Sequence, residues 1–160
     1  MWDGVIGDKR VLSTCSRMNH HTMTSLHDLQ AVLDSSPFMQ QYGFRVESCD
    51  GETCTIFCPG RADALRPDGI MSGPVFMAAA DVAMWMAMIH TLGPDAVSTV
   101  TVEMKTNFVS ALVGAQDFRC TSTILKAGSR LVFGTADCRT NDGRLLTHHT
   151  MTYFRRDKQG

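Results

Sequence analysis

Asp81 is the residue of this chain whose setting best suits chemistry. It is the one Asp, Glu, Lys or Arg within residues 72–90, a long segment made mostly of Val, Phe, Met, Ala, Trp and Ile. A carboxylate in apolar surroundings is costly unless it is paired or hydrogen-bonded, and such groups concentrate at functional sites. It could activate water as a general base or attack a carbonyl carbon directly. The structural alternative is a carboxylate that only accepts hydrogen bonds from a partner loop.

Gly73 and Ser72 stand at the start of the same segment. If the segment is a helix, its first N–H groups are unpaired and lie at the positive end of the helix dipole, where they can stabilise an oxyanion. Glycine permits a carbonyl group to approach closely, although a plain turn is an equally simple role for Gly73. Ser72 is a good N-cap residue, and its hydroxyl could alternatively bind substrate or water.

The segment 72–90 is expected to be a helix buried on all sides, because it has no polar face. Ser72 can cap it, and Pro74 suits its first turn, where a missing N–H costs nothing. The length would also suffice to cross a membrane. Asp81, Pro74 and the β-rich remainder of the chain argue against that interpretation.

The rest of the chain supplies the elements that must surround this helix. Leucine and valine spacing predicts a short amphipathic helix over 25–34, and Asp50-Gly51 predicts a hairpin turn. Strands are expected over 44–48, 53–58, 97–109, 116–126, 130–140 and 145–154. The order α, β, β, long α and four β predicts the α+β class, with an antiparallel sheet of about six strands wrapped around the long helix.

Composition narrows the class of protein further. The chain has 160 residues, 44% hydrophobic and 19% charged, with a formal net charge of −1. This suits one globular domain and gives no general attraction to nucleic acid or to an anionic membrane. The six cysteines are expected to be reduced thiols that act as small hydrophobes, which predicts a cytoplasmic protein. Residues 1–22 lack the apolar core of a signal peptide and are expected to be a disordered extension.

Several short motifs follow one another in the order seen in the PaaI-like acyl-CoA thioesterases, a family with the hotdog fold. Ala62-Asp63-Ala64-Leu65 leads through a loop to Ser72-Gly73-Pro74, which resembles the His-Gly-Gly turn of that family. Ala80-Asp81-Val82-Ala83 resembles the Ala-Asp-x-Ala of its central helix, nine residues after the turn. The strand at 99–108 and the hairpins at 126–130 and 142–143 are also similar. The resemblance covers 37–155, most of the chain.

The resemblance implies a hotdog domain over 23–156 that hydrolyses an acyl-CoA to a carboxylic acid and free CoA. Asp81 would be the base or the nucleophile, and the Gly73 N–H would polarise the carbonyl. The family forms homodimers or dimers of dimers with the site at the interface, and it needs no cofactor beyond the CoA of the substrate. Two positions depart from the family pattern, since Ser72 replaces the usual His and Arg66 stands where Asn is frequent.

Positive charges near the predicted turns could bind the substrate. Arg66 could hold an acyl carboxylate or a CoA phosphate, or pair with Asp81 across an interface. The family resemblance implies that Arg130, with Lys126 and Ser129, contacts the CoA phosphates. In each case the structural alternative is a charge that only faces solvent.

Asn107 is a further candidate for substrate binding, because a polar amide within a strand needs a partner. His148 and His149 are adjacent on a strand and should point to opposite faces, so no metal site is expected there. Two other functions stay open. The departures at Ser72 and Arg66 also suit an acyl-ligand binding protein without catalysis, whereas a hotdog dehydratase or hydratase would need a histidine between residues 66 and 81.

Overall fold

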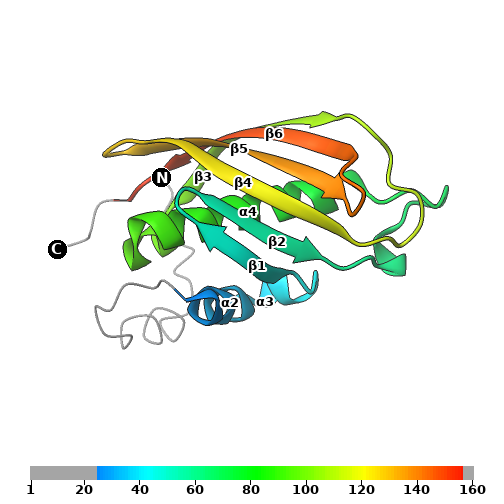
Figure 1. Ribbon diagram of the computed structural model, residues 1–160, viewed down its shortest axis with the longest axis horizontal. Helices are drawn as coiled ribbons and strands as arrows, with labels where there is room; N and C mark the ends of the chain where they lie inside the picture. The colour runs from blue at the N-terminus through cyan, green and yellow to red at the C-terminus, as the bar shows by residue number, and fades with distance from the viewer. Residues whose placement is uncertain (1–24, 157–160) are drawn as a thin grey trace, which may run out of the picture.

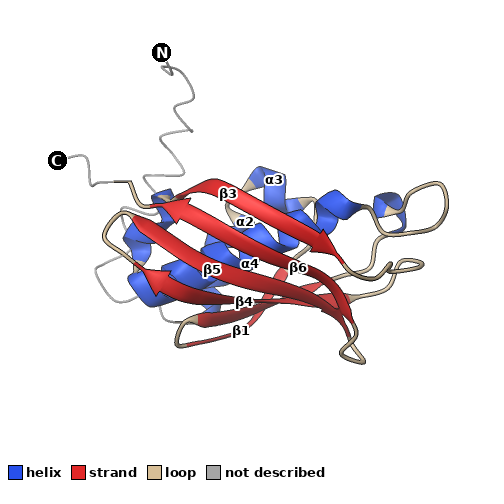
Figure 2. Ribbon diagram, turned by 90° about the horizontal axis from the view of Figure 1, so that it is seen from above, coloured by secondary structure: helices blue, strands red, loops and turns tan. Residues whose placement is uncertain are grey.

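The computed structural model describes residues 25–156, so the prediction of disorder for 1–22 lies outside the described residues. Six antiparallel strands form a single curved sheet in the order β1-β2-β4-β5-β6-β3, and the long helix α4 lies along one face of it (Figures 1 and 2). The predicted α+β class, element order and strand number are confirmed.

The first part of the chain forms two short helices and a hairpin. Helix α2 spans Leu26–Asp34, and the Ser25 hydroxyl caps it by accepting a hydrogen bond from the N–H of Asp28 at 3.1 Å. Helix α3 covers Pro37–Gln40, and strands β1 (Arg45–Asp50) and β2 (Thr53–Cys58) follow. The chain turns between these strands at Gly51, whose φ of 53° suits glycine.

Helix α4 spans Gly73–Leu92 and forms the centre of the core. Ser72 occupies the N-cap position and Pro74 lies in the first turn, as predicted, although the Ser72 side chain makes no capping hydrogen bond. The helix is long and apolar enough to cross a membrane. Half of its 20 residues are instead buried in the protein core, including Met84, Met86 and Met88.

The four remaining strands are β3 (Val100–Phe108), β4 (Phe118–Ala127), β5 (Leu131–Thr140) and β6 (Leu145–Phe154). The prediction that β3 begins at residue 97 is wrong, because Pro94–Ser98 form a short 3-10 helix. The carbonyl of Val97 accepts a hydrogen bond from the indole of Trp85 at 3.3 Å, which ties this turn to α4.

The prediction that the cysteines are all reduced is wrong for Cys49 and Cys54, which form a disulfide. The β1–β2 hairpin places them directly opposite each other with Cα atoms 4.1 Å apart, a pairing that depends on strand register. Cys58, Cys120 and Cys138 are free and buried, as expected for small hydrophobes.

Candidate active site

Asp81 lies in the third turn of α4, half-buried, with its carboxylate held by two hydroxyl groups. The Tyr153 hydroxyl, from β6, donates to Oδ1 at 2.7 Å, and the Thr101 hydroxyl, from β3, donates to the same atom at 2.8 Å. Neither partner was predicted from the sequence, because Tyr153 lies 72 positions away along the chain. The only available signal was that a carboxylate in an apolar helix must have donors somewhere.

The start of α4 presents an unused backbone donor. The N–H of Gly73 donates to no acceptor within the described residues, and the next residue is Pro74, which has no N–H. A Cβ at position 73 would lie 3.0 Å from the ring of Phe108, so glycine here permits the close approach of that ring. The turn therefore offers a free N–H beside an exposed aromatic side chain.

Asp81 and Gly73 are too far apart to act together within one chain. They are eight positions apart on one helix, which corresponds to about 12 Å along its axis. They nevertheless border the least buried side of α4, on which Pro74, Met77 and Trp85 are exposed or half-buried. The sheet of the same chain leaves this side partly open, since Met77 on it is exposed.

Strand β3 runs beside that open side of α4 and is an edge strand, next to β6 (Figure 2). Its two ends meet the two candidate groups, because Thr101 contacts Asp81 and Phe108 lies against Gly73. Val100, Val102 and Phe108 are exposed, so the edge is apolar as well as unpaired in this chain. An unpaired apolar edge is suited to pairing with another strand.

Arg66 is exposed and lies in the loop before α4, where it forms an ion pair with Asp68. The Arg66 guanidinium lowers the pKa of the Asp68 carboxyl from its usual value, chiefly through this hydrogen bond. The pairing of Arg66 with Asp81 is therefore not made within one chain.

Lys126, Ser129 and Arg130 come together in the β4–β5 hairpin, and all three are exposed. The carbonyl of Arg130 accepts a hydrogen bond from the N–H of Arg155 at 2.8 Å, so this hairpin lies beside the end of β6. Tyr153 is two positions before Arg155. The basic hairpin is thus nearer to Asp81 than to Gly73.

Asn107 is exposed and lies on the outer face of the sheet, away from α4. Its neighbour Thr106 faces inward, where its hydroxyl is 3.0 Å from Nδ1 of the buried His149, and neighbouring strand residues face opposite sides. The structure therefore does not bring Asn107 together with Asp81 or Gly73 in one chain. The opposite orientation of His148 and His149 is confirmed, since His148 contacts Asp137 on the outer face.

The outer-face contact between Asp137 and His148 predicts a pH-dependent contribution to stability. Burial opposes the charge of Asp137, but hydrogen bonds from His148 at 2.7 Å and from Arg139 at 2.8 Å outweigh it and lower the pKa of the carboxyl. A lowered pKa stabilises the fold above the unfolded value of about 3.9, and the effect is lost as the pH falls through the folded value.

Asp137→Asn should therefore lower the melting temperature by about 2 °C at pH 7 and by less at about pH 3, because the stabilisation shrinks as the pH falls below the unfolded value toward the folded pKa. Thermal unfolding followed by circular dichroism between these pH values measures the difference. Asp34→Asn, at an exposed carboxylate, is the control. An equal loss at both pH values would show that Asp137 contributes through packing and not through its charge.

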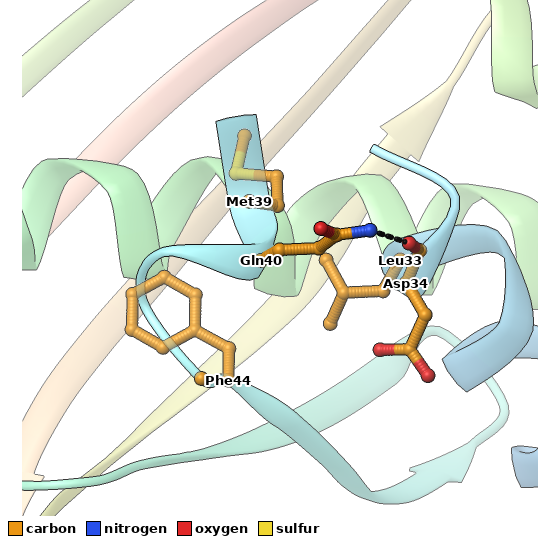
Figure 3. Close-up of a pocket in the computed structure, with 6 residues that line it drawn as sticks. Leu33, Asp34, Met39, Gln40 and Phe44 are labelled. Atoms are coloured by element: carbon orange, nitrogen blue, oxygen red, sulfur yellow. Dashed lines mark hydrogen bonds between the residues drawn. The ribbon is translucent and has the colours of Figure 1, made fainter. Parts of the chain in front are cut away.

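A cavity of about 270 Å³ lies between α2, α3 and the start of β1, but its lining holds none of the predicted site residues (Figure 3). Gln40 closes one side by donating from Nε2 to the carbonyl of Asp34 at 2.6 Å. Among residues 25–156, no group of three or more His, Cys, Asp or Glu side chains is placed to hold a metal ion. The candidate site is therefore the α4–β3 region.

A family model described as the thioesterase superfamily matches residues 68–147, which include α4 and strands β3 to β5. No curated protein matches the chain.

Solved structures agree with the fold. A conserved protein from Pseudomonas aeruginosa is 26% identical with a TM-score of 0.70, covering 76% of this chain and 94% of that protein. A mutant of the phenylacetic acid degradation protein PaaI from Thermus thermophilus is 22% identical with a TM-score of 0.68, covering 76% and 100%. Zebra fish thioesterase superfamily member 2 is 20% identical with a TM-score of 0.73, covering 82% and 99%. The predicted resemblance to the PaaI-like hotdog thioesterases is confirmed.

Proposed function

Because this chain belongs to the thioesterase superfamily, we propose that it hydrolyses an acyl-CoA thioester to a carboxylic acid and free CoA. The observation that carries the proposal is that two chemically suitable groups both border the open side of α4. One is the free N–H of Gly73, and the other is the half-buried Asp81 carboxylate, whose Oδ2 accepts no hydrogen bond from the described residues. Together these supply an oxyanion donor and a base or nucleophile.

The proposed site is completed by a second copy of the chain, because about 12 Å of helix separate the two groups in one copy. Strand β3 runs antiparallel to α4, with Thr101 beside Asp81 and Phe108 beside Gly73. Antiparallel pairing of β3 with its symmetry mate, about an axis near the middle of the strand, brings the Thr101 end of one copy to the Phe108 end of the other. Asp81 of one subunit then faces Gly73 of its partner.

In this arrangement the thioester carbonyl oxygen accepts a hydrogen bond from the Gly73 N–H. Asp81 either removes a proton from the attacking water or attacks the carbonyl carbon itself, forming an anhydride that water then hydrolyses. In both routes the C–S bond breaks, the sulfur leaves as the CoA thiolate, and the acyl group gains a hydroxyl oxygen from water. The oxyanion that forms in between is stabilised by the Gly73 N–H and the helix dipole.

Lys126, Ser129 and Arg130 are proposed to hold the phosphates of CoA, on the Asp81 side of the site. Asn107 and Arg66 are not proposed to contact the thioester from the same subunit as Asp81. They would contact the substrate either from the partner subunit or away from the thioester. Arg66 can exchange Asp68 for a carboxylate or phosphate of the substrate, since its present ion pair is exposed. Ser72, whose hydroxyl makes no capping bond, is proposed to contact the acyl carbonyl or a water.

Thiol release from a panel of short, long and aromatic acyl-CoAs tests the proposal with the wild-type protein. We expect at least one class to be hydrolysed with kcat/KM on the order of 10⁴ M⁻¹s⁻¹. Free CoA is measured with a thiol reagent, and each acyl-CoA is also titrated by calorimetry. Binding without thiol release across the panel would overturn the hydrolase and favour an acyl-ligand binding protein.

A further inference from the structure

The two hydroxyl groups at Asp81 reach the same carboxylate oxygen. Tyr153 donates from β6 at 2.7 Å and Thr101 donates from β3 at 2.8 Å, and both bonds end on Oδ1. An oxygen that accepts two hydrogen bonds from hydroxyl groups has few lone-pair directions left for a further partner. Among the described residues, Oδ2 is left without such a donor.

We infer that Tyr153 and Thr101 are positioning residues, which hold Oδ1 so that Oδ2 is the oxygen that reacts with water or with the thioester. The inference rests on the proposed function and deepens it, because it assigns separate roles to the two oxygens of Asp81. It also predicts that both residues act through Asp81 and touch neither the substrate nor the leaving group.

Strand register explains why the two hydroxyl groups converge. Thr101 and Tyr153 are directly opposite each other on β3 and β6, and the next inward pair is Met104 with Met151. The inward positions are two residues apart in sequence on β6 but three apart on β3, because a bulge at Val102 inserts one extra residue. Without the bulge, Thr101 and Met104 would face opposite sides of the sheet. The bulge therefore turns the Thr101 hydroxyl toward Asp81, as bulges beside functional sites do.

Tyr153 is suited to donating a hydrogen bond and not to exchanging protons. Its side chain is buried, and burial followed by the negative charge of Asp81 raises the pKa of the phenol well above its usual value. The hydroxyl therefore stays protonated throughout the working pH range. The sulfur of Met151, 3.5 Å from the hydroxyl, is a weak acceptor and does not compete with the carboxylate.

A kinetic double-mutant cycle tests the inference. Tyr153→Phe and Thr101→Val each remove one hydroxyl with little change in shape, and each should lower kcat about 10- to 100-fold with KM changed less than about twofold. Thr101→Ser, which keeps the hydroxyl, should restore kcat to within about threefold of the wild type. Tyr42→Phe, at the only other tyrosine, is the matched control and should be silent.

The same substitutions made in Asp81→Asn separate positioning from a general structural role. If Tyr153 and Thr101 act only through Asp81, their removal should change the remaining rate of Asp81→Asn by less than about twofold. Equal losses in both backgrounds, or a raised KM with unchanged kcat, would overturn the inference.

A readout without turnover separates this inference from the proposed function. If the wild type releases no thiol from any acyl-CoA, the proposed function is wrong. The contact itself is then measured by melting temperature, where Tyr153→Phe and Asp81→Ala should together lose less than the sum of their separate losses. Additive losses would show that Tyr153 does not hold Asp81.

Discussion

Asp81→Asn should lower the rate of thiol release about a thousandfold while leaving the fold intact. An amide of nearly the same shape cannot take a proton from water at neutral pH and cannot form an anhydride. Its Oδ1 can still accept the hydrogen bonds from Tyr153 and Thr101, so the local packing should survive. Steady-state kinetics with the best acyl-CoA of the panel, together with circular dichroism, measures both effects.

Asp34→Asn is the control for this substitution, because Asp34 is an exposed carboxylate at the end of α2. It should retain the wild-type rate. Thiol release that continues unchanged in Asp81→Asn would remove Asp81 from the mechanism. A loss of rate with a matching loss of helical signal would instead show that the substitution unfolds the protein.

Mixing two inactive variants should restore activity to about a quarter of the wild-type rate per subunit, if each site uses Gly73 from one copy and Asp81 from the other. Asp81→Asn supplies one partner. Gly73→Pro supplies the other, because proline removes the N–H at position 73 and is tolerated in the first helical turn. A mixed dimer then has one site with both wild-type groups and one site with neither, and half of the dimers are mixed after random exchange.

The matched control for Gly73→Pro is Gly73→Ala, which also adds a Cβ near Phe108 but keeps the N–H. The alanine variant should therefore lose less activity than the proline variant. Native mass spectrometry establishes how many dimers are mixed. If mixed dimers form and no activity returns, both groups of a site belong to one chain and the proposed shared site is wrong.

Features that depend on neighbouring residues could be predicted from the sequence, and features that depend on distant residues could not. Short-range periodicity and turn chemistry, which are properties of neighbouring residues, were enough to predict three features. These are helix α4, the Asp50-Gly51 hairpin, and the opposite faces of His148 and His149. Asp81 also stood out from the sequence, because one carboxylate in an apolar helix is visible without knowledge of the fold.

Other features depend on strand pairing and could not be predicted from local patterns. Cys49 and Cys54 face each other only because of the β1–β2 register. Asn107 faces outward while Thr106 reaches His149, a choice that depends on which side of β3 meets α4. The basic hairpin at Arg130 resembled a substrate site in sequence, and only the fold placed it beside the end of β6.

The sequence alone therefore determined the elements, their order and the residue most suited to chemistry, Asp81. The tertiary structure decided what surrounds that residue. Tyr153 and Thr101 reach one carboxylate oxygen because β3 and β6 are neighbours and a bulge at Val102 shifts their register. Such contacts join positions far apart in the chain, and their geometry depends on the pairing of whole strands and not on the neighbours of any one residue.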